Sequence, residues 1–399
     1  MVSPKNSRMT NLGMAHAYQF LLTYLTIPLY IFGWRISIGI WCRATTATPA
    51  STKGRVIDLP TQARERPSLC PGNYSYQNLG SGKSTIRLLK LEPAIFDEPL
   101  IGTLEQVDLR EAEGSYTALS YVWGSLQNPK VLLIEGASIS ITSSLDIALR
   151  YVRSTTSTIT LWVDAICIDQ NKDREKGQQI PFMPKIYAQS ETVLSWIGEA
   201  TPSSTSGMDI LSYLASDEPF SDDSPWNRMT ADDICFGLRD ILGRIYFRRI
   251  WIVQEAALGR RNKMQAGDIS LRWEGAEDAQ RFLTRIKLLE VSPIWQSEIL
   301  RETDLRPIRE LLEQSVADRD RKLGIRRPMT FLDLVHAMRH RESTDPRDRI
   351  YGLMGLASPA EIAGFSLDYQ DSWEGLYQRF YDHVYQIALQ NHDQAWQGS

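Results

Sequence analysis

The feature that most constrains the fold is a near-continuous apolar run, TITLWVDAICI, at residues 158–168. Its length and its β-branched residues favour a buried central strand, and such strands are typical of sheets that helices cover. A helix-spaced apolar pattern precedes it at residues 145–152, and patterns typical of a helix and a strand follow at 172–189 and 192–197. This alternation predicts an α/β fold with a mixed, partly parallel sheet flanked by helices.

Other segments extend this pattern in both directions. Alternating residues predict strands over 84–91 and 116–123, a hairpin with strands 131–134 and 138–141, and a strand pair within 264–273. Helical spacing predicts helices over 231–242, 276–289, 331–341, 347–356 and 373–389, so the C-terminal part is expected to be mainly helical. Residues 200–225 are rich in Ser, Asp and Pro and predict a surface loop, and the pattern at 250–258 fits either a helix or a strand.

The chain divides into three predicted parts. Residues 1–73 form an N-terminal extension with an apolar stretch at 17–41 and a linker-like segment at 44–53. The apolar stretch is at the lower length limit for a membrane span, so a membrane anchor and a buried helix or unfolded extension both stay open. A cleaved signal peptide fits less well. The core domain is predicted over 74–260, followed by a mixed and then mainly helical region over 261–399.

Composition limits the classes of function. The net charge is −4, and basic clusters such as residues 319–322 are interrupted by acidic side chains, which argues against a nucleic-acid partner. Neither a structural zinc site nor a disulfide framework is expected, because no CxxC pair occurs among the four cysteines, Cys42, Cys70, Cys167 and Cys235. This usage fits an intracellular, cytoplasmic location, with the N-terminal apolar stretch as the candidate membrane contact.

Three separated blocks combine aromatic and charged residues: YTALSYVWG at 116–124, LWVDAICIDQ at 161–170 with its continuation to 198, and RIWIVQE at 249–255. In this order and at these separations they resemble the three motifs of the fungal heterokaryon incompatibility (HET) domain. Similar flanking segments extend the resemblance over about residues 74–369. The motif residues are Tyr116, Ser120, Trp123, Gly124, Trp162, Asp164, Cys167, Gln170, Tyr187, Arg249, Trp251, Gln254 and Glu255.

The resemblance carries expectations for fold and function. A HET domain implies a signalling protein of vegetative incompatibility, in which recognition of non-self through a protein partner or self-association leads to programmed cell death. It also implies a remote similarity to TIR domains, some of which cleave NAD. Two features depart from the family pattern. Pro181 and Pro184 predict that the helix after the second motif either starts later, near Pro184, or is broken. Asp169 occupies a position that is more often Asn.

Asp164, Asp169 and Glu255 are the candidate catalytic residues. Under one interpretation they surround a crevice at the carboxyl ends of the strands, where open α/β sheets bind ligands. By analogy with TIR domains, Glu255 would then be the catalytic glutamate of an NAD or nucleotide hydrolase. The interpretation that we favour involves no catalysis and no cofactor: Asp164 lies in so apolar a run that it needs a partner, which Arg248 or Arg249 would provide in a structural ion pair. A membrane-tethered regulatory or scaffold protein, such as a gene-cluster passenger, is the third alternative.

Several other patterns indicate structural roles. Cys167 adjoins an apolar strand, where a thiol is usually an inert packing group instead of a nucleophile. The segment GSGKST at 80–85 lacks the first glycine of a phosphate-binding loop and predicts a turn. His336 and His340 share a helix face without a metalloprotease motif, so no metal is expected. Large buried areas are expected for the aromatic residues Tyr121, Trp123, Trp162, Trp196 and Trp251.

Overall fold

The computed structural model describes residues 72–80, 84–325 and 329–397, all of which belong to one compact unit, Pro71–Ser399. The apolar stretch predicted at 17–41, the linker at 44–53, Cys42 and Cys70 lie outside the described residues. Within the described ranges, every helix is too short or too polar to cross a membrane.

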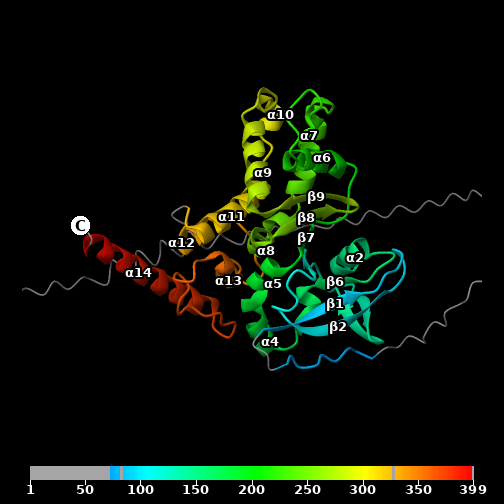
Figure 1. Ribbon diagram of the computed structural model, residues 1–399, viewed down its shortest axis with the longest axis vertical. Helices are drawn as coiled ribbons and strands as arrows, with labels where there is room; N and C mark the ends of the chain where they lie inside the picture. The colour runs from blue at the N-terminus through cyan, green and yellow to red at the C-terminus, as the bar shows by residue number, and fades with distance from the viewer. Residues whose placement is uncertain (1–71, 81–83, 326–328, 398–399) are drawn as a thin grey trace, which may run out of the picture. The chain divides into compact units, whose positions relative to one another are not determined.

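A mixed sheet forms the centre of the unit (Figure 1). In the part of the chain that the structure describes it has nine strands, in the order β5-β4-β2-β1-β6-β3-β7-β8-β9. Neighbours β6, β3, β7 and β8 run parallel to one another, as do β2 and β4, whereas the other pairs are antiparallel. The strands are β1 Thr85–Leu91, β2 Leu100–Asp108, β3 Thr117–Ser120, β4 Lys130–Ile134, β5 Ala137–Ile141, β6 Ile159–Trp162, β7 Thr192–Trp196, β8 Arg261–Ala266 and β9 Ile269–Glu274.

Helices flank the sheet, and the C-terminal part is mainly helical, as predicted. Figure 1 shows α6, α7 and α9 grouped beside β8 and β9, with α10 at the far end of α7 and α9, and α6 packs directly on α7, α9 and β9. The α-helices are α2 Ser143–Val152, α3 Asp164–Cys167, α4 Asp173–Gln179, α5 Met183–Gln189, α6 Ser204–Ala215, α7 Ala231–Leu242, α8 Ile252–Leu258, α9 Gly275–Glu290, α10 Glu298–Arg301, α11 Arg306–Leu323, α12 Phe331–Ala337, α13 Asp348–Tyr351 and α14 Trp373–Gln397. The 3₁₀ turns are η1 Ile180–Phe182, η2 Pro225–Asn227, η3 Ile245–Arg248, η4 Pro293–Gln296 and η5 Met354–Leu356.

Local sequence explains why several elements begin and end where they do. Thr230 caps α7 with a capping box, in which its side chain accepts from the Asp233 amide and the Asp233 side chain accepts from the Thr230 amide. The predicted hairpin is confirmed as β4 and β5, and its turn places Glu135 and Gly136 at φ of 51° and 84°. These positive values suit a tight turn between twisted strands.

Two predictions about elements are wrong. The strand predicted over 158–168 ends at Trp162, and Asp164 begins the short helix α3, because an apolar run alone does not distinguish strand from buried helix. The region 200–225, predicted as a loop, contains α6. The domain boundary at residue 260 stays a prediction; residue 260 directly precedes β8, which pairs with β7 in the same sheet.

Other predictions hold. The helix over 172–189 is broken as its prolines predict, into α4, η1 with Pro181, and α5 with Pro184 in its first turn. The ambiguous segment 250–258 becomes α8.

Candidate functional site

The parallel strands β6 and β3 bring the first two sequence motifs to one edge of the sheet. β3 ends at Ser120 and β6 at Trp162, and the paired residues Ala118 and Trp162 fix their register. Helix α8, which carries the third motif, packs against β7, the other neighbour of β3. All three motifs therefore meet at the carboxyl ends of the parallel strands.

Glu255 is the most enclosed carboxyl group of the site, with only 2% of its surface exposed. The Ser120 hydroxyl donates to Glu255 Oε2, and Ser120 Oγ also lies 2.9 Å from the Tyr246 hydroxyl. Burial raises the pKa of Glu255 to about 7, although the positive charge of Arg249 and the hydrogen bond from Ser120 act in the opposite direction. Burial therefore favours the protonated carboxyl group at this position.

Asp164 is the second carboxyl group of the site. Its Oδ2 accepts a 2.7 Å hydrogen bond from the indole Nε1 of Trp123, and its Oδ1 accepts one of 2.7 Å from the Ala165 amide. Burial raises the pKa of Asp164, opposed first by the charge of Arg249 and then by the Trp123 hydrogen bond. The backbone carbonyl of Asp164 also accepts from the Gln170 side chain at 2.9 Å, which holds the chain after α3 against the site.

Arg249 supplies positive charge near both carboxyl groups, although the predicted ion pair between Asp164 and a neighbouring arginine is not among the described contacts. Its guanidinium donates to the backbone carbonyl of Tyr121, at the end of β3, and its charge lowers the pKa of both Asp164 and Glu255. Arg248 instead faces Glu342, with 3.9 Å between the charged atoms. We call Ser120, Trp123, Asp164, Tyr246, Arg249 and Glu255 the motif cluster.

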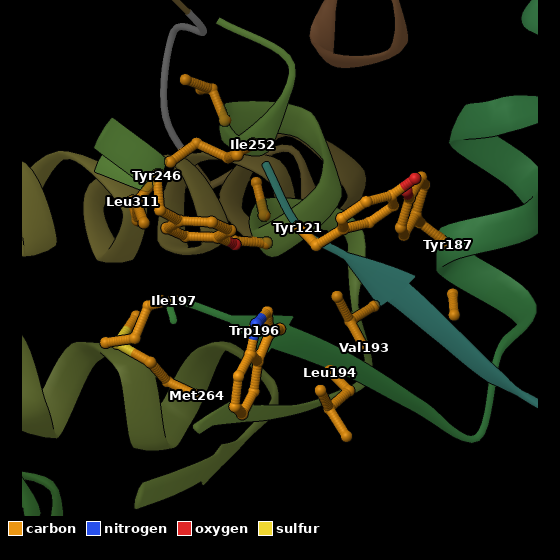
Figure 2. Close-up of a cluster of buried hydrophobic side chains, with 14 of the residues drawn as sticks. Tyr121, Tyr187, Val193, Leu194, Trp196, Ile197, Tyr246, Ile252, Met264 and Leu311 are labelled. Carbon is orange, nitrogen blue, oxygen red and sulfur yellow. The ribbon is translucent and has the colours of Figure 1, made fainter. Parts of the chain in front are cut away.

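Tyr246 is a member of the motif cluster that the sequence alone did not predict. It lies in η3, directly before the third motif, and 1% of its surface is exposed. Figure 2 shows Tyr246 with Tyr121 and Tyr187 in a buried group of side chains beside β7. Burial raises the pKa of all three tyrosines, so their hydroxyl groups stay protonated and can donate hydrogen bonds. The signal that could have found Tyr246 is an aromatic residue three positions before Arg249.

Asp169 does not join the motif cluster through any of the described hydrogen bonds or ion pairs. Its carboxylate lies 3.2 Å from Lys172 Nζ, and its amide donates to Glu175 Oε1 at 2.8 Å. Glu175 in turn forms a buried ion pair with Arg87 at 2.5 Å. The three carboxylates predicted around one crevice are therefore divided between two separate polar networks.

The remaining motif residues mostly build the core. The Tyr116 hydroxyl donates to the Ile186 carbonyl at 2.6 Å, and Trp162 is fully buried with an edge contact to Tyr187 at 5.5 Å between ring centroids. Gly124 adopts a φ of 71°, which favours glycine. Trp123 departs from the prediction that it is a core residue, because 39% of its surface is exposed while its indole nitrogen faces Asp164.

Cys167, His336 and His340 have neighbours typical of structural side chains. Cys167 is buried, its thiol lies 3.3 Å from the Val163 amide nitrogen, and burial raises its pKa to about 12, so it stays a neutral packing group at physiological pH. His340 Nε2 lies 3.1 Å from Glu310, and His336 contacts Arg339. No group of three or more metal-ligating side chains occurs among the residues that the structure describes.

Comparison with known proteins agrees with this geometry. Residues 116–255, from the first motif to the last residue of the third, match the family model of the heterokaryon incompatibility protein (HET). Heterokaryon incompatibility protein 6, OR allele, from Neurospora crassa is 26% identical over 367 residues, covering 75% of this chain and 51% of that relative. The chain thus spans about half the length of the relative it matches.

No solved structure matches the chain, so the predicted remote similarity to TIR domains is not confirmed. The family match ends at Glu255, and its span contains every residue of the motif cluster. Over residues 116–255 the chain is therefore similar to the heterokaryon incompatibility (HET) family, as the three motifs predict.

Proposed function

We propose that this protein is a signalling component of heterokaryon incompatibility, in which recognition of non-self leads to growth arrest and programmed cell death. The observation that carries the proposal is the convergence of all three HET motifs on the motif cluster within residues 116–255. A relative whose name records a role in heterokaryon incompatibility supports it.

The enclosed position of Glu255 favours a binding or conformational role over catalysis. A catalytic carboxylate must reach its substrate, and 2% exposure leaves this one covered by the protein's own side chains. A buried acid with a raised pKa can instead stabilise one arrangement of packed elements over another. The signal would then be a change in this arrangement when a protein partner or a second copy of the chain binds.

Expression in a filamentous fungus tests the proposal. The 399-residue chain is placed under an inducible promoter, and hyphal extension and viability staining are followed after induction. We expect growth arrest for the natural sequence and for Glu111→Gln, a control at an exposed glutamate. Normal growth despite accumulation of soluble, folded protein would contradict the proposal.

The hydrolase and membrane alternatives need different measurements. Purified protein is incubated with NAD, and its turnover is compared with that of Glu255→Ala; turnover lost in the variant would replace the signalling proposal with an enzymatic one. Fractionation of the full chain against a chain lacking residues 1–43 tests membrane attachment separately. Neither result depends on the growth assay.

A further inference from the structure

A groove with a volume of about 930 Å³ lies between α5, α8, the end of α11 and residues 351–367. Gln254 lies at its base, where the side-chain Oε1 is buried against Gly355 and has no hydrogen-bond partner in the part of the chain that the structure describes. Recognition of a partner therefore depends on the charged side chains of the groove and on its apolar lining, which includes Pro184, Leu258, Met354 and Phe365.

Positive charge predominates at this groove. Its charged side chains are Lys185, Arg321, Lys322 and Asp318. Asp318 lies 3.3 Å from Arg321 and 2.6 Å from Lys322, so a single carboxylate serves two of the three cations. Lys185 and Lys322 are both exposed. An apolar surface with an excess of positive charge favours a partner that combines apolar and acidic side chains.

The chain itself exposes a segment of this composition between α6 and α7. All seven residues of 217–223, DEPFSDD, are exposed, and four of them are acidic. We call this segment the acidic loop. Asp217 pairs with Arg281 and Asp223 pairs with Arg228, whereas Glu218 and Asp222 form no ion pair with any residue that the structure describes. Two carboxylates of the acidic loop are therefore open to an outside partner.

Contacts within the same chain hold the acidic loop in shape. Phe220 packs edge-on against Trp226 with 5.2 Å between ring centroids, and the Arg285 guanidinium lies 4.5 Å from the Phe220 ring centroid. The Tyr213 hydroxyl donates to the Pro219 carbonyl at 2.5 Å. These contacts still leave 40% of the Phe220 surface exposed. A loop that is ordered before it binds loses little conformational entropy on binding.

The acidic loop and the groove belong to different parts of one compact unit. Figure 1 shows α6 and α7, which flank the loop, away from α5 and α13, which border the groove. The loop is also anchored, because α6 packs on α7, α9 and β9. The acidic loop of one chain is therefore placed to meet the groove of another chain. Because the two surfaces differ, such a contact joins copies head to tail.

We propose that this groove binds the acidic loop of a second copy of the chain. The two unpaired carboxylates of one copy would face Lys185 and Lys322 of the next copy, and the exposed edge of Phe220 would cover the apolar lining. The contact gives the signalling function proposed above its partner, and its biological role rests on that function. The contact itself is measured with purified protein, so its failure is distinguishable from a failure of the growth assay.

Sedimentation velocity of the 399-residue chain tests the proposal with two charge-reversed variants. Glu218→Lys with Asp222→Lys changes only the acidic loop, and Lys185→Glu with Lys322→Glu changes only the groove. We expect the natural chain to self-associate as its concentration rises to about 100 µM, and to form species larger than a dimer. Each variant alone should associate at least about tenfold more weakly, because like charges then face each other.

A mixture of the two variants separates this contact from any other mode of association. One variant keeps the natural groove and the other keeps the natural acidic loop, so mixing them should restore association. Asp97→Lys with Glu111→Lys is the control, since it makes the same change in charge at two other exposed acids and should associate as the natural chain does. Unchanged thermal unfolding shows that each variant is folded.

Three outcomes would overturn the proposal. The first is a natural chain that stays monomeric at about 100 µM. The second is association that persists undiminished in either charge-reversed variant, which would place the contact elsewhere on the chain. The third is a mixture of the two folded variants that fails to associate.

Discussion

The indole nitrogen of Trp123 donates a 2.7 Å hydrogen bond to Asp164 Oδ2. This contact joins the first HET motif to the second across 41 positions of sequence, at a place where Trp123 still exposes 39% of its surface. The indole N–H of Trp123 therefore has a role at the surface. Loss of its hydrogen bond to Asp164 should lower the free energy of unfolding.

Trp123→Phe removes this donor and keeps an aromatic ring. We expect the free energy of unfolding to fall by about 1–2 kcal/mol, because a hydrogen bond to a charged group is lost beside partly exposed surface. Trp373→Phe is the matched control, since Trp373 is half-buried and contacts Tyr377 by its ring alone. Both variants are compared by urea unfolding at neutral pH. Equal losses of unfolding free energy would show that the hydrogen bond to Asp164 does not contribute to stability.

The raised pKa of Glu255 predicts how stability depends on pH. Burial favours the protonated form, so the folded state binds this proton more tightly than the unfolded state, whose ordinary pKa is 4.5. The associated stability is present at low pH and is lost as the pH rises towards about 7. In Glu255→Gln we expect the fall in unfolding free energy between about pH 5 and about pH 8 to be smaller by on the order of 2 kcal/mol. Identical pH profiles for the two proteins would exclude this account of Glu255.

Adjacent arginines offer a comparison of half-buried and exposed charge. Arg249→Gln removes the cation that acts on Asp164 and Glu255, and we expect a loss of about 2–3 kcal/mol of unfolding free energy. Arg248→Gln breaks only an exposed pair at 3.9 Å, for which we expect less than about 1 kcal/mol. Differential scanning calorimetry of both variants checks which substitution costs more stability. A larger loss for Arg248→Gln than for Arg249→Gln would contradict the role given to Arg249.

The contact between α6 and α7 depends on two facing glycines. A Cβ atom at Gly207 would lie 2.2 Å from the Gly237 carbonyl oxygen, so Gly207→Ala must push the helices apart. We expect a loss of more than about 3 kcal/mol or a failure to fold. Gly177→Ala is the control within another helix, where nothing lies within 4 Å, and it should stabilise the protein by about 0.5–1 kcal/mol. A neutral Gly207→Ala variant in thermal unfolding would contradict the close packing.

The sequence predicts best the elements whose signals are local. The helix over 231–242 matches α7 residue for residue because amphipathic spacing and the Thr230 cap act together. The hairpin of β4 and β5 follows from alternation around a turn. Strand β2 and helix α11 carry weaker signals: β2 exposes several polar residues, and α11 buries Gln314, Asp318 and Asp320 in place of apolar groups.

The site could be predicted only through the ordered set of motifs, which places residues far apart in the sequence in one site. Trp123, Asp164, Arg249 and Glu255 do meet, as the ordered motifs indicate. The separation of Asp169 from them could not be predicted, since it depends on α3 turning the chain directly after β6. The unpaired amide of Gln254 is equally invisible in sequence, because its environment comes from Gly355, about a hundred residues later.

The claim that the three motifs form one energetically connected cluster is tested most directly by a double-mutant cycle between Ser120 and Glu255, which are 135 positions apart. Unfolding free energies are measured for Ser120→Ala, Glu255→Gln and the double variant at neutral pH. We predict a coupling energy of at least about 1 kcal/mol, because each substitution alone leaves a buried polar partner unpaired or weakened. Additive losses, with a coupling energy near zero, would contradict the existence of the cluster.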